Sequence, residues 1–396
     1  MPQETRSSVS VASMNCHSSV HIPLTIEEDK LIDGSVKVLS VIRPTWAKEK
    51  VNFKVFTDGI TNKLLGCFHE DFPEDVVLVR VYGHKTDLLI DRNAETRNIQ
   101  LLHNAGYAPH LYATFCNGLA YEYVSGVVLD TTSCRDPDVF PLVARMVALV
   151  HKVDSTDDVP KEPSIWLKIE QFLSIMPQTF KEAEKQARFL ELIPPKSRLE
   201  EEYALLKTEL SSVGSPIVFC HNDLLLANVI YNAKKNTVTF IDYEYSSHNY
   251  QAFDIGNHFA EYAGVADVDY AAYPSPEFQR NWLRIYLETF HSTTEMSGAN
   301  DITEHDISCL YVQVNKFALA AHFLWAIWAL IQAEHSTIDF DFLGIMVKVI
   351  FTMHICGGVA YSSMQQPLCC VKGRGVGGPK GGLNVMICRK DTAFYW

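Results

Sequence analysis

The sequence predicts a two-lobed α+β fold, with a small β-rich amino-terminal lobe and a larger, mainly helical carboxy-terminal lobe. Strand-like runs lie on both sides of a helix at 92–104, whereas helical periodicity dominates from about residue 140. With 396 residues, 47% of them hydrophobic and 20% charged, the chain can bury two cores of ordinary globular composition. We expect a disordered segment over 1–22, lobes over 23–126 and 127–344, and a Gly/Cys-rich tail over 345–396.

The amino-terminal lobe is predicted to begin with a helix, which is followed by strands on both sides of a second helix. A helix near residues 26–39 carries acidic residues early, as helix amino termini often do. Three strands should follow at 51–56, 63–68 and 76–82, and then a helix at 92–104. A hairpin of two strands, 111–116 and 120–124, ends the lobe. The polar segment Thr57–Asn62 forms the first turn, and Asn117-Gly118 closes the hairpin.

The carboxy-terminal lobe is predicted to be built mostly from helices. Its expected elements are a helix at 140–151, amphipathic helices within 164–212, short apolar strands at 217–220 and 238–241, and mainly helix over 254–331. The most apolar stretch, Phe317–Ile331, spans 15 residues, fewer than the roughly 20 that cross a membrane. We therefore predict a buried helix there and no membrane span.

Charge and cysteine usage exclude several classes of function. The net charge of −13 disfavours binding to nucleic acid or to an anionic membrane surface. The ten cysteines show no metal-type pairs, so we expect buried, reduced thiols at positions such as Cys67, Cys116, Cys134, Cys220 and Cys309. The Ser-rich amino terminus lacks the pattern of a secretory signal. A cytoplasmic location is the expectation.

A group of polar residues around the two short strands carries the chemistry. Asp223 follows the first strand, Asn228 comes five residues later, and Asp242 ends the next apolar run. Kinases place a base, a metal-binding amide and a metal-binding carboxylate in this order. Phosphoryl transfer needs a group that orients the attacking hydroxyl and oxygen ligands for Mg²⁺ on the triphosphate. The spacing therefore predicts an ATP-dependent kinase.

The same region argues against a protein kinase. Asn222 stands where such enzymes have arginine, Tyr243-Glu244 replaces Phe-Gly, and no Ala-Pro-Glu closes an activation segment. Without that segment there is little platform for a peptide, so we expect a small-molecule acceptor.

Four segments carry a family resemblance. They are Phe56–Leu64, Val77–Gly83, His221–Asn228 and Ile241–Glu261, the last including Asp254-Ile255-Gly256-Asn257. The chain resembles the choline/ethanolamine kinase family, most closely its ethanolamine kinases, from roughly residue 24 to Gly344. The resemblance implies a protein-kinase-like fold and phosphorylation of ethanolamine by ATP with Mg²⁺, which begins the CDP-ethanolamine route to phosphatidylethanolamine. The resemblance is also compatible with a homodimer.

The resemblance implies roles for the catalytic loop. Asp223 would be the catalytic base, although an Asx turn or helix cap is the ordinary use of such an aspartate. Asn228 and Asp242 would bind the metal. His221 and Asp254 would support the loop, Asp254 by capping a helix or by bracing the loop.

The nucleotide site is expected in the amino-terminal lobe. Arg80 would contact phosphate oxygens and Glu95 would hold it, although a lone pair of this kind is usually a surface ion pair. Phosphates would lie under the Gly59 turn, whose ordinary alternative is a plain hairpin, and adenine would lie at the hinge. The residues expected there are Gly59, Thr61 and Asn62 in the turn, and Glu122, Tyr123 and Val124 in the hinge.

The amine site would combine one carboxylate with aromatic rings. Glu261 matches the cation-facing carboxylate of the family, and Trp325 and Trp328 match its aromatic wall, with Tyr245 adding a ring. A cation over an indole face gains about 0.5–2 kcal/mol. Spacing alone favours core packing for the two tryptophans, and the resemblance reverses that choice.

The carboxyl terminus departs from the family. After Gly344 the family continues with a tyrosine and an aromatic-rich helix, whereas this chain has Ile345 and then a segment holding eight of its 20 glycines between Gly357 and Gly382. Two alternatives therefore stand beside ethanolamine kinase. One is a choline kinase, and the other is a weakly active variant that binds nucleotide or a partner.

Overall fold

The computed structural model describes residues 19–56, 62–83, 89–155, 161–264, 268–292, 302–336 and 340–346. The chain divides into two compact units, each treated separately below. Unit 1 comprises Met1–His84 and Pro109–Tyr123, and unit 2 comprises Lys85–Ala108 and Val124–Trp396. The predicted Gly/Cys-rich tail lies outside the described residues from 347 onward.

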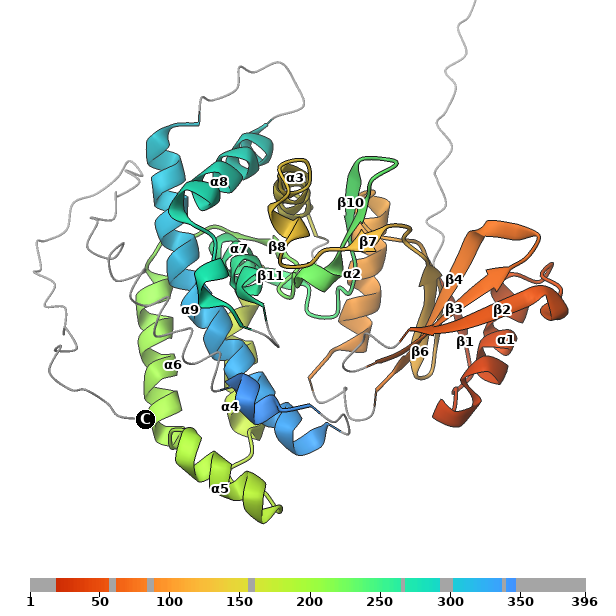
Figure 1. The fold of residues 1–396 in the computed structure, drawn as a ribbon, viewed down its shortest axis with the longest axis horizontal. Helices are drawn as coiled ribbons and strands as arrows, with labels where there is room; N and C mark the ends of the chain where they lie inside the picture. The colour runs from red at the N-terminus through yellow and green to blue at the C-terminus, as the bar shows by residue number, and fades with distance from the viewer. Residues whose placement is uncertain are drawn as a thin grey trace, which may run out of the picture. The chain divides into compact units, whose positions relative to one another are not determined.

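In its described residues, unit 1 forms a six-stranded sheet with one α-helix (Figure 1). The strand order is β1-β5-β6-β4-β3-β2, and the strands span Val20–Ile22 (β1), Val51–Phe56 (β2), Asn62–His69 (β3), Phe72–Tyr82 (β4), Leu111–Phe115 (β5) and Gly118–Glu122 (β6). Helix α1, Leu31–Ile42, buries Val38 and Leu39 in a core shared with the sheet. Gly118 is required because a Cβ there would lie 2.1 Å from the Arg80 carbonyl oxygen.

Unit 2 is mainly helical and, in the part of the chain that the structure describes, contains two small antiparallel sheets. Its helices are α2 (Arg92–Asn104), α3 (Phe140–His151), α4 (Ser164–Ile175), α5 (Ala183–Leu192), α6 (Lys196–Ser211), α7 (Gln251–Ala260), α8 (Pro276–His291) and α9 (Glu304–His335). One sheet has the order β10-β9-β7, from Thr237–Phe240, Val229–Asn232 and Val127–Val128, and the other pairs β11, Ser247–Tyr250, with β8, Ile217–Cys220. The segments that connect these strands carry the predicted catalytic residues.

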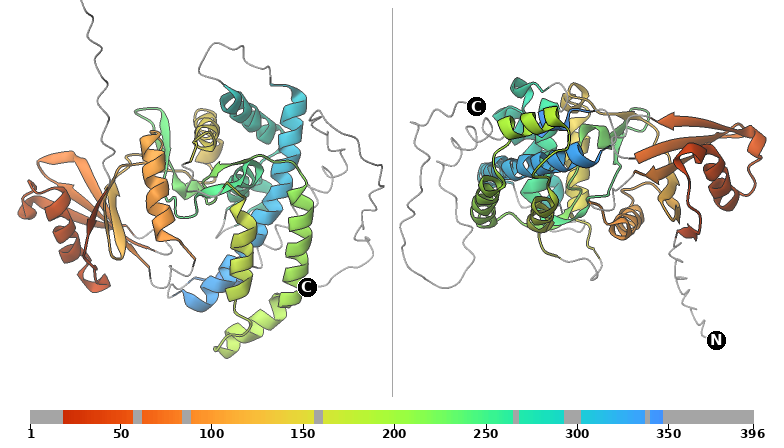
Figure 2. Two further views of the ribbon diagram at one scale, coloured as in Figure 1. Left: turned by 180° about the vertical axis from the view of Figure 1, so that it is seen from behind. Right: turned by 90° about the horizontal axis from the view of Figure 1, so that it is seen from below.

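Helix α9 forms the centre of unit 2. It packs against α7, α4, α8 and α6, and α4 and α6 flank it when the molecule is seen from behind (Figure 2). Gly256 of α7 allows a close crossing, because a Cβ there would lie 2.7 Å from the Val314 carbonyl oxygen. Although α9 is long and apolar enough to cross a membrane, 83% of its most apolar window is buried inside the protein. The predicted buried helix is therefore present and is longer than Phe317–Ile331.

Three sequence predictions need correction. Residues 20–22 are not part of a disordered segment, because β1 pairs in parallel with β5 and buries Ile22. Helix α2, predicted to lie in the amino-terminal lobe, belongs to unit 2, where the Asn98 side chain donates to the Ser246 carbonyl at 2.6 Å. Among the thiols predicted to be buried, Cys116 is exposed where it follows β5.

Candidate functional site

The predicted catalytic loop connects β8 to β9 and ends in a 3-10 turn, Leu226–Asn228. The backbone has φ values of 66° at Asn222 and 65° at Asp242. Asparagine and aspartate adopt this left-handed conformation more readily than most residues that carry a side chain. The chain therefore turns sharply beside Asp223, and turns again at Asp242.

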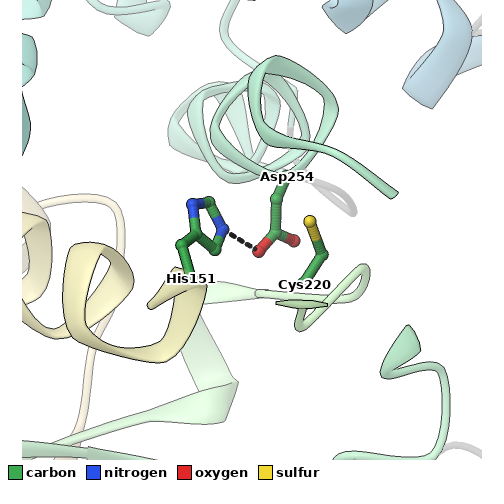
Figure 3. A group of neighbouring side chains, drawn as sticks. All are labelled: His151, Cys220 and Asp254. Atoms are coloured by element: carbon green, nitrogen blue, oxygen red, sulfur yellow. Dashed lines mark hydrogen bonds and ion pairs between the residues drawn. The ribbon is translucent and has the colours of Figure 1, made fainter. Parts of the chain in front are cut away.

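A buried carboxylate from α7 fixes the start of this loop. Asp254 accepts hydrogen bonds from the backbone amides of His221 at 3.0 Å and Asn222 at 2.7 Å. Its Oδ2 also lies 2.9 Å from Nε2 of His151, the last residue of α3 (Figure 3). Burial alone would raise the pKa of Asp254, but the hydrogen bond and charge of His151 lower it below its ordinary value. Asp254 therefore braces the loop, one of its two predicted roles.

The side chains of His221 and Asn222 hold the loop at two further points. The His221 Nε2 lies 3.0 Å from the Ile241 carbonyl, and Nδ1 accepts the Asp223 amide at 3.3 Å. This arrangement suits the neutral Nε2–H tautomer, and burial lowers the pKa of His221. Asn222 donates to the Ser247 hydroxyl at 2.9 Å. His221 thus supports the loop through hydrogen bonds, as predicted.

The predicted metal-binding amide lies directly against the catalytic segment. Asn228 donates through Nδ2 to the Asp223 carbonyl at 2.9 Å, and the Asn228 carbonyl accepts the Ile241 amide at 3.0 Å. The first contact fixes the amide, whose oxygen keeps lone pairs for a cation. The second contact joins the loop to the residue that precedes Asp242.

Asp242 belongs to an acidic cluster. Its carboxylate, Glu95 and Glu244 offer oxygens that all lie within 4.8 Å of one another. Arg92 Nη1 contacts Glu95 at 3.0 Å and Glu244 at 3.1 Å. An all-oxygen set of this kind suits Mg²⁺ better than zinc.

The electrostatics of Asp223 also favour a bound cation. Burial, followed by the charges of Asp242, Glu244 and Glu261, raises the pKa of Asp223 well above its ordinary value. A divalent cation close to Asp242 would offset this repulsion and favour the carboxylate form of Asp223.

The predicted aromatic wall is a continuous chain of rings. The Tyr245 and Trp325 rings are perpendicular with centroids 5.4 Å apart, and Trp325 and Trp328 follow at 5.8 Å. Within residues 317–333 of α9, every side chain is buried except these two tryptophans, which are only partly buried. Core packing alone would bury them like their neighbours, so the exposure pattern favours a binding wall.

Glu261 lies close to this wall through α7. The Trp325 indole donates to Asn257 Oδ1 at 2.7 Å, and Glu261 follows Asn257 by one helical turn on the same face. Burial raises the pKa of Glu261 to about 7. A carboxylate in such surroundings gains from pairing with a cation.

Sequence reasoning missed two cationic side chains of unit 2. Arg92 bridges Glu95 and Glu244, and Lys168 of α4 lies with its Nζ 5.8 Å from the Tyr245 ring centroid. Neither residue belongs to a catalytic motif. The amphipathic pattern of α4 places Lys168 two residues after the buried Trp166. The pattern does not show which aromatic ring the Lys168 side chain contacts.

The predicted nucleotide residues are divided between the units. Arg80 is buried on β4, paired in register with Leu64 and Leu119, whereas Glu95 lies on α2 of unit 2. Their pairing stays a prediction. Asn62 begins β3, and Gly59 and Thr61 lie outside the described residues.

The predicted hinge coincides with the boundary between the units. Tyr123 ends unit 1 and Val124 resumes unit 2. The Glu122 amide donates to the His110 carbonyl at 2.9 Å, and the Tyr123 amide donates to the Val76 carbonyl at 3.2 Å. A hinge contact with adenine would therefore use other backbone atoms.

Comparison with known proteins identifies relatives of this chain. A family model described as choline/ethanolamine kinase matches residues 53–351, beyond the family boundary predicted at Gly344. Ethanolamine kinase 1 of Mus musculus is 49% identical, over 81% of this chain and 88% of that protein. The ethanolamine kinase of Drosophila melanogaster is 44% identical, over 82% and 76%. A solved Plasmodium vivax ethanolamine kinase is 27% identical with a TM-score of 0.74, covering 85% of this chain and 91% of that one. The predicted two-lobed, protein-kinase-like fold is confirmed.

Proposed function

The chain belongs to the choline/ethanolamine kinase family, and from this premise we propose that it transfers the γ-phosphoryl group of ATP to the hydroxyl of ethanolamine. The products are ADP and phosphoethanolamine, and the reaction begins the CDP-ethanolamine route to phosphatidylethanolamine. The observation that carries the proposal is the presence, in one compact unit, of the Asp223 loop and the aromatic wall with Glu261. Its relatives are named ethanolamine kinases.

The mechanism assigns one task to each group of residues. Asp223 accepts the hydrogen bond of the substrate hydroxyl and aligns its oxygen with the γ-phosphorus. A new P–O bond forms while the bond to the β–γ bridging oxygen breaks, ADP leaves, and the hydroxyl proton passes to Asp223. Asn228 and Asp242 would hold Mg²⁺, which neutralises charge on the triphosphate.

The substrate ammonium is bound at the other end of the site. Glu261 and the rings of Tyr245, Trp325 and Trp328 surround the cation by charge and cation–π attraction. Arg80, Glu95, the Gly59 turn with Thr61 and Asn62, and the hinge residues complete the proposed nucleotide site. We propose a cytoplasmic location for the reaction.

ADP release coupled to a detectable reaction tests the proposal. The full chain is incubated with ATP and Mg²⁺ together with ethanolamine, choline or neither. Ethanolamine-dependent turnover that Asp223→Ala abolishes would support it. Turnover with choline alone would instead identify a choline kinase, and stabilisation by ATP without turnover would identify a weakly active variant.

The altered carboxyl terminus keeps the last alternative relevant. Ile345 and Met346 are buried, and the Trp328 ring lies 5.9 Å from the Phe342 ring just before them. The chain therefore packs against the aromatic wall at Phe342, and it stays buried at Ile345 and Met346, within the residues that the family model matches. Comparing turnover with a chain that carries the usual family terminus measures the effect of the tail.

A further inference from the structure

Lys168 occupies an unusual position beside the proposed amine site. Its Nζ lies over the Tyr245 ring, 5.8 Å from the centroid, and over the Phe172 ring at 5.7 Å. The same Tyr245 ring contacts Trp325. A cation of the protein therefore already occupies part of the aromatic surface that a substrate cation would use.

The surroundings of Lys168 hold its side chain in this position. Nζ donates to the Leu89 carbonyl at 3.0 Å, and the carboxylates of Asp91 and Glu244 act on it through their charges. Burial lowers the pKa of Lys168, against the effect of these two carboxylates. The lysine is thus fixed by a backbone acceptor and by charge, and it does not extend freely into solvent.

Primary and quaternary ammonium groups respond differently to such a neighbour. A primary ammonium has N–H donors and can be bound by carboxylates such as Glu261. A quaternary ammonium has no N–H group, and proteins bind it mainly through several aromatic faces. Covering one ring face, and placing a positive charge there, therefore weakens binding of the quaternary cation more strongly.

We propose that Lys168 is a specificity-determining residue that covers the Tyr245 ring and biases the site toward a primary over a quaternary ammonium. This inference rests on the proposed function and deepens it, because it names the class of amine that the site selects. Lys168 acts by limiting the aromatic surface open to the substrate.

The test compares kcat/KM for choline and ethanolamine in full-length variants. Lys168→Met removes the charge, and Lys168→Gln removes the charge but keeps a donor for the Leu89 carbonyl. In both we expect the choline-to-ethanolamine ratio to rise roughly two- to thirtyfold, the range of one cation–π contact. Inhibition by tetramethylammonium, competitive with ethanolamine, should strengthen in parallel.

Two controls separate this role from a structural one. Lys168→Arg keeps a cation in place and should hold the ratio near that of the wild type. Lys207→Met removes another lysine over a tyrosine ring, 5.5 Å from Tyr203 on α6, and should not change the ratio. Thermal unfolding identifies folded variants, and Lys168→Gln serves if Lys168→Met does not fold.

The outcomes distinguish the inference from the proposed function. A ratio that rises in the Met and Gln variants but in neither control supports the inference. An unchanged ratio in a folded Lys168→Met or Lys168→Gln protein, or an equal loss of kcat/KM with both substrates, overturns the inference. Ethanolamine turnover by the wild type would still support the proposed function in that case. A wild type that releases no ADP with ethanolamine overturns both.

Discussion

Replacing Glu261 by glutamine should stabilise the free protein at high pH while weakening its binding of ethanolamine. Burial raises the pKa of Glu261 from 4.5 to about 7. The folded state therefore binds a proton more tightly than the unfolded state between these values, and stability is lost as pH rises through this window. Glu261→Gln has no carboxylate to ionise, so it escapes this loss.

The size of the effect follows from the same two pKa values. Ionisation of Glu261 costs the folded state about 0.8 kcal/mol at pH 5 and about 3.3 kcal/mol at pH 8, by linkage between folding and protonation. The stability of Glu261→Gln relative to the wild type should therefore increase by about 2.5 kcal/mol from pH 5 to pH 8. Partial exposure of Glu261 makes this an upper value.

Urea unfolding of both proteins at pH 5, 6, 7 and 8 measures the difference. Glu191→Gln, which changes an exposed glutamate of α5, is the matched control and should show no such trend. The kcat/KM of the wild type for ethanolamine should also fall as pH drops below about 7, because Glu261 becomes neutral. A stability difference between Glu261→Gln and wild type that does not change with pH would refute the reasoning.

Four further substitutions test other parts of unit 2. Asp223→Ala should lower kcat by roughly 10²–10⁴-fold in the coupled assay and retain stabilisation by ATP; near-normal turnover would exclude Asp223 as the base. Asp254→Asn should lower the free energy of unfolding by about 3–5 kcal/mol in urea, since it breaks a buried pair with His151, and a loss below about 1 kcal/mol would contradict the bracing role. Trp325→Phe should raise KM for ethanolamine severalfold, whereas Trp282→Phe in the core should lower stability without changing KM; equal effects on KM would point to core packing. Gly256→Ala should cost about 1–3 kcal/mol in thermal unfolding, because its Cβ would meet the α9 backbone, and full stability would show that the helices can separate without strain.

Local patterns in the sequence predicted much of the fold and the chemical character of the site. The helices at 92–104 and 140–151 and the strand at 217–220 have the predicted bounds, because apolar periodicity and short-range signals determine them. The spacing of Asp223, Asn228 and Asp242 predicted kinase chemistry, because the first two residues lie within one short loop whose form depends on local sequence. Helix α9 extends beyond the apolar stretch Phe317–Ile331 at both ends, and the capping box at Thr303 and Asp306 marks its start in the sequence.

The missed features depend on contacts between distant segments. His151 reaches Asp254 across 103 positions, and Arg92 reaches Glu244 across 152. Periodicity reports which face of a helix is buried, but not which residue it meets. The same limit applies to Lys168 over Tyr245, and to α2, whose packing partner rather than its sequence assigns it to unit 2.

Helix α7 connects the loop that carries Asp223 with Glu261 of the proposed amine site. Asp254 near its start holds the loop that carries Asp223, and Glu261 directly follows its last residue, seven positions later. An α-helix rises 1.5 Å per residue, so about 10 Å of rigid backbone separates the two anchors. The loop that carries Asp223 and the carboxylate of Glu261 are thus both positioned by the same helix. The loop and Glu261 therefore cannot shift relative to each other unless α7 bends.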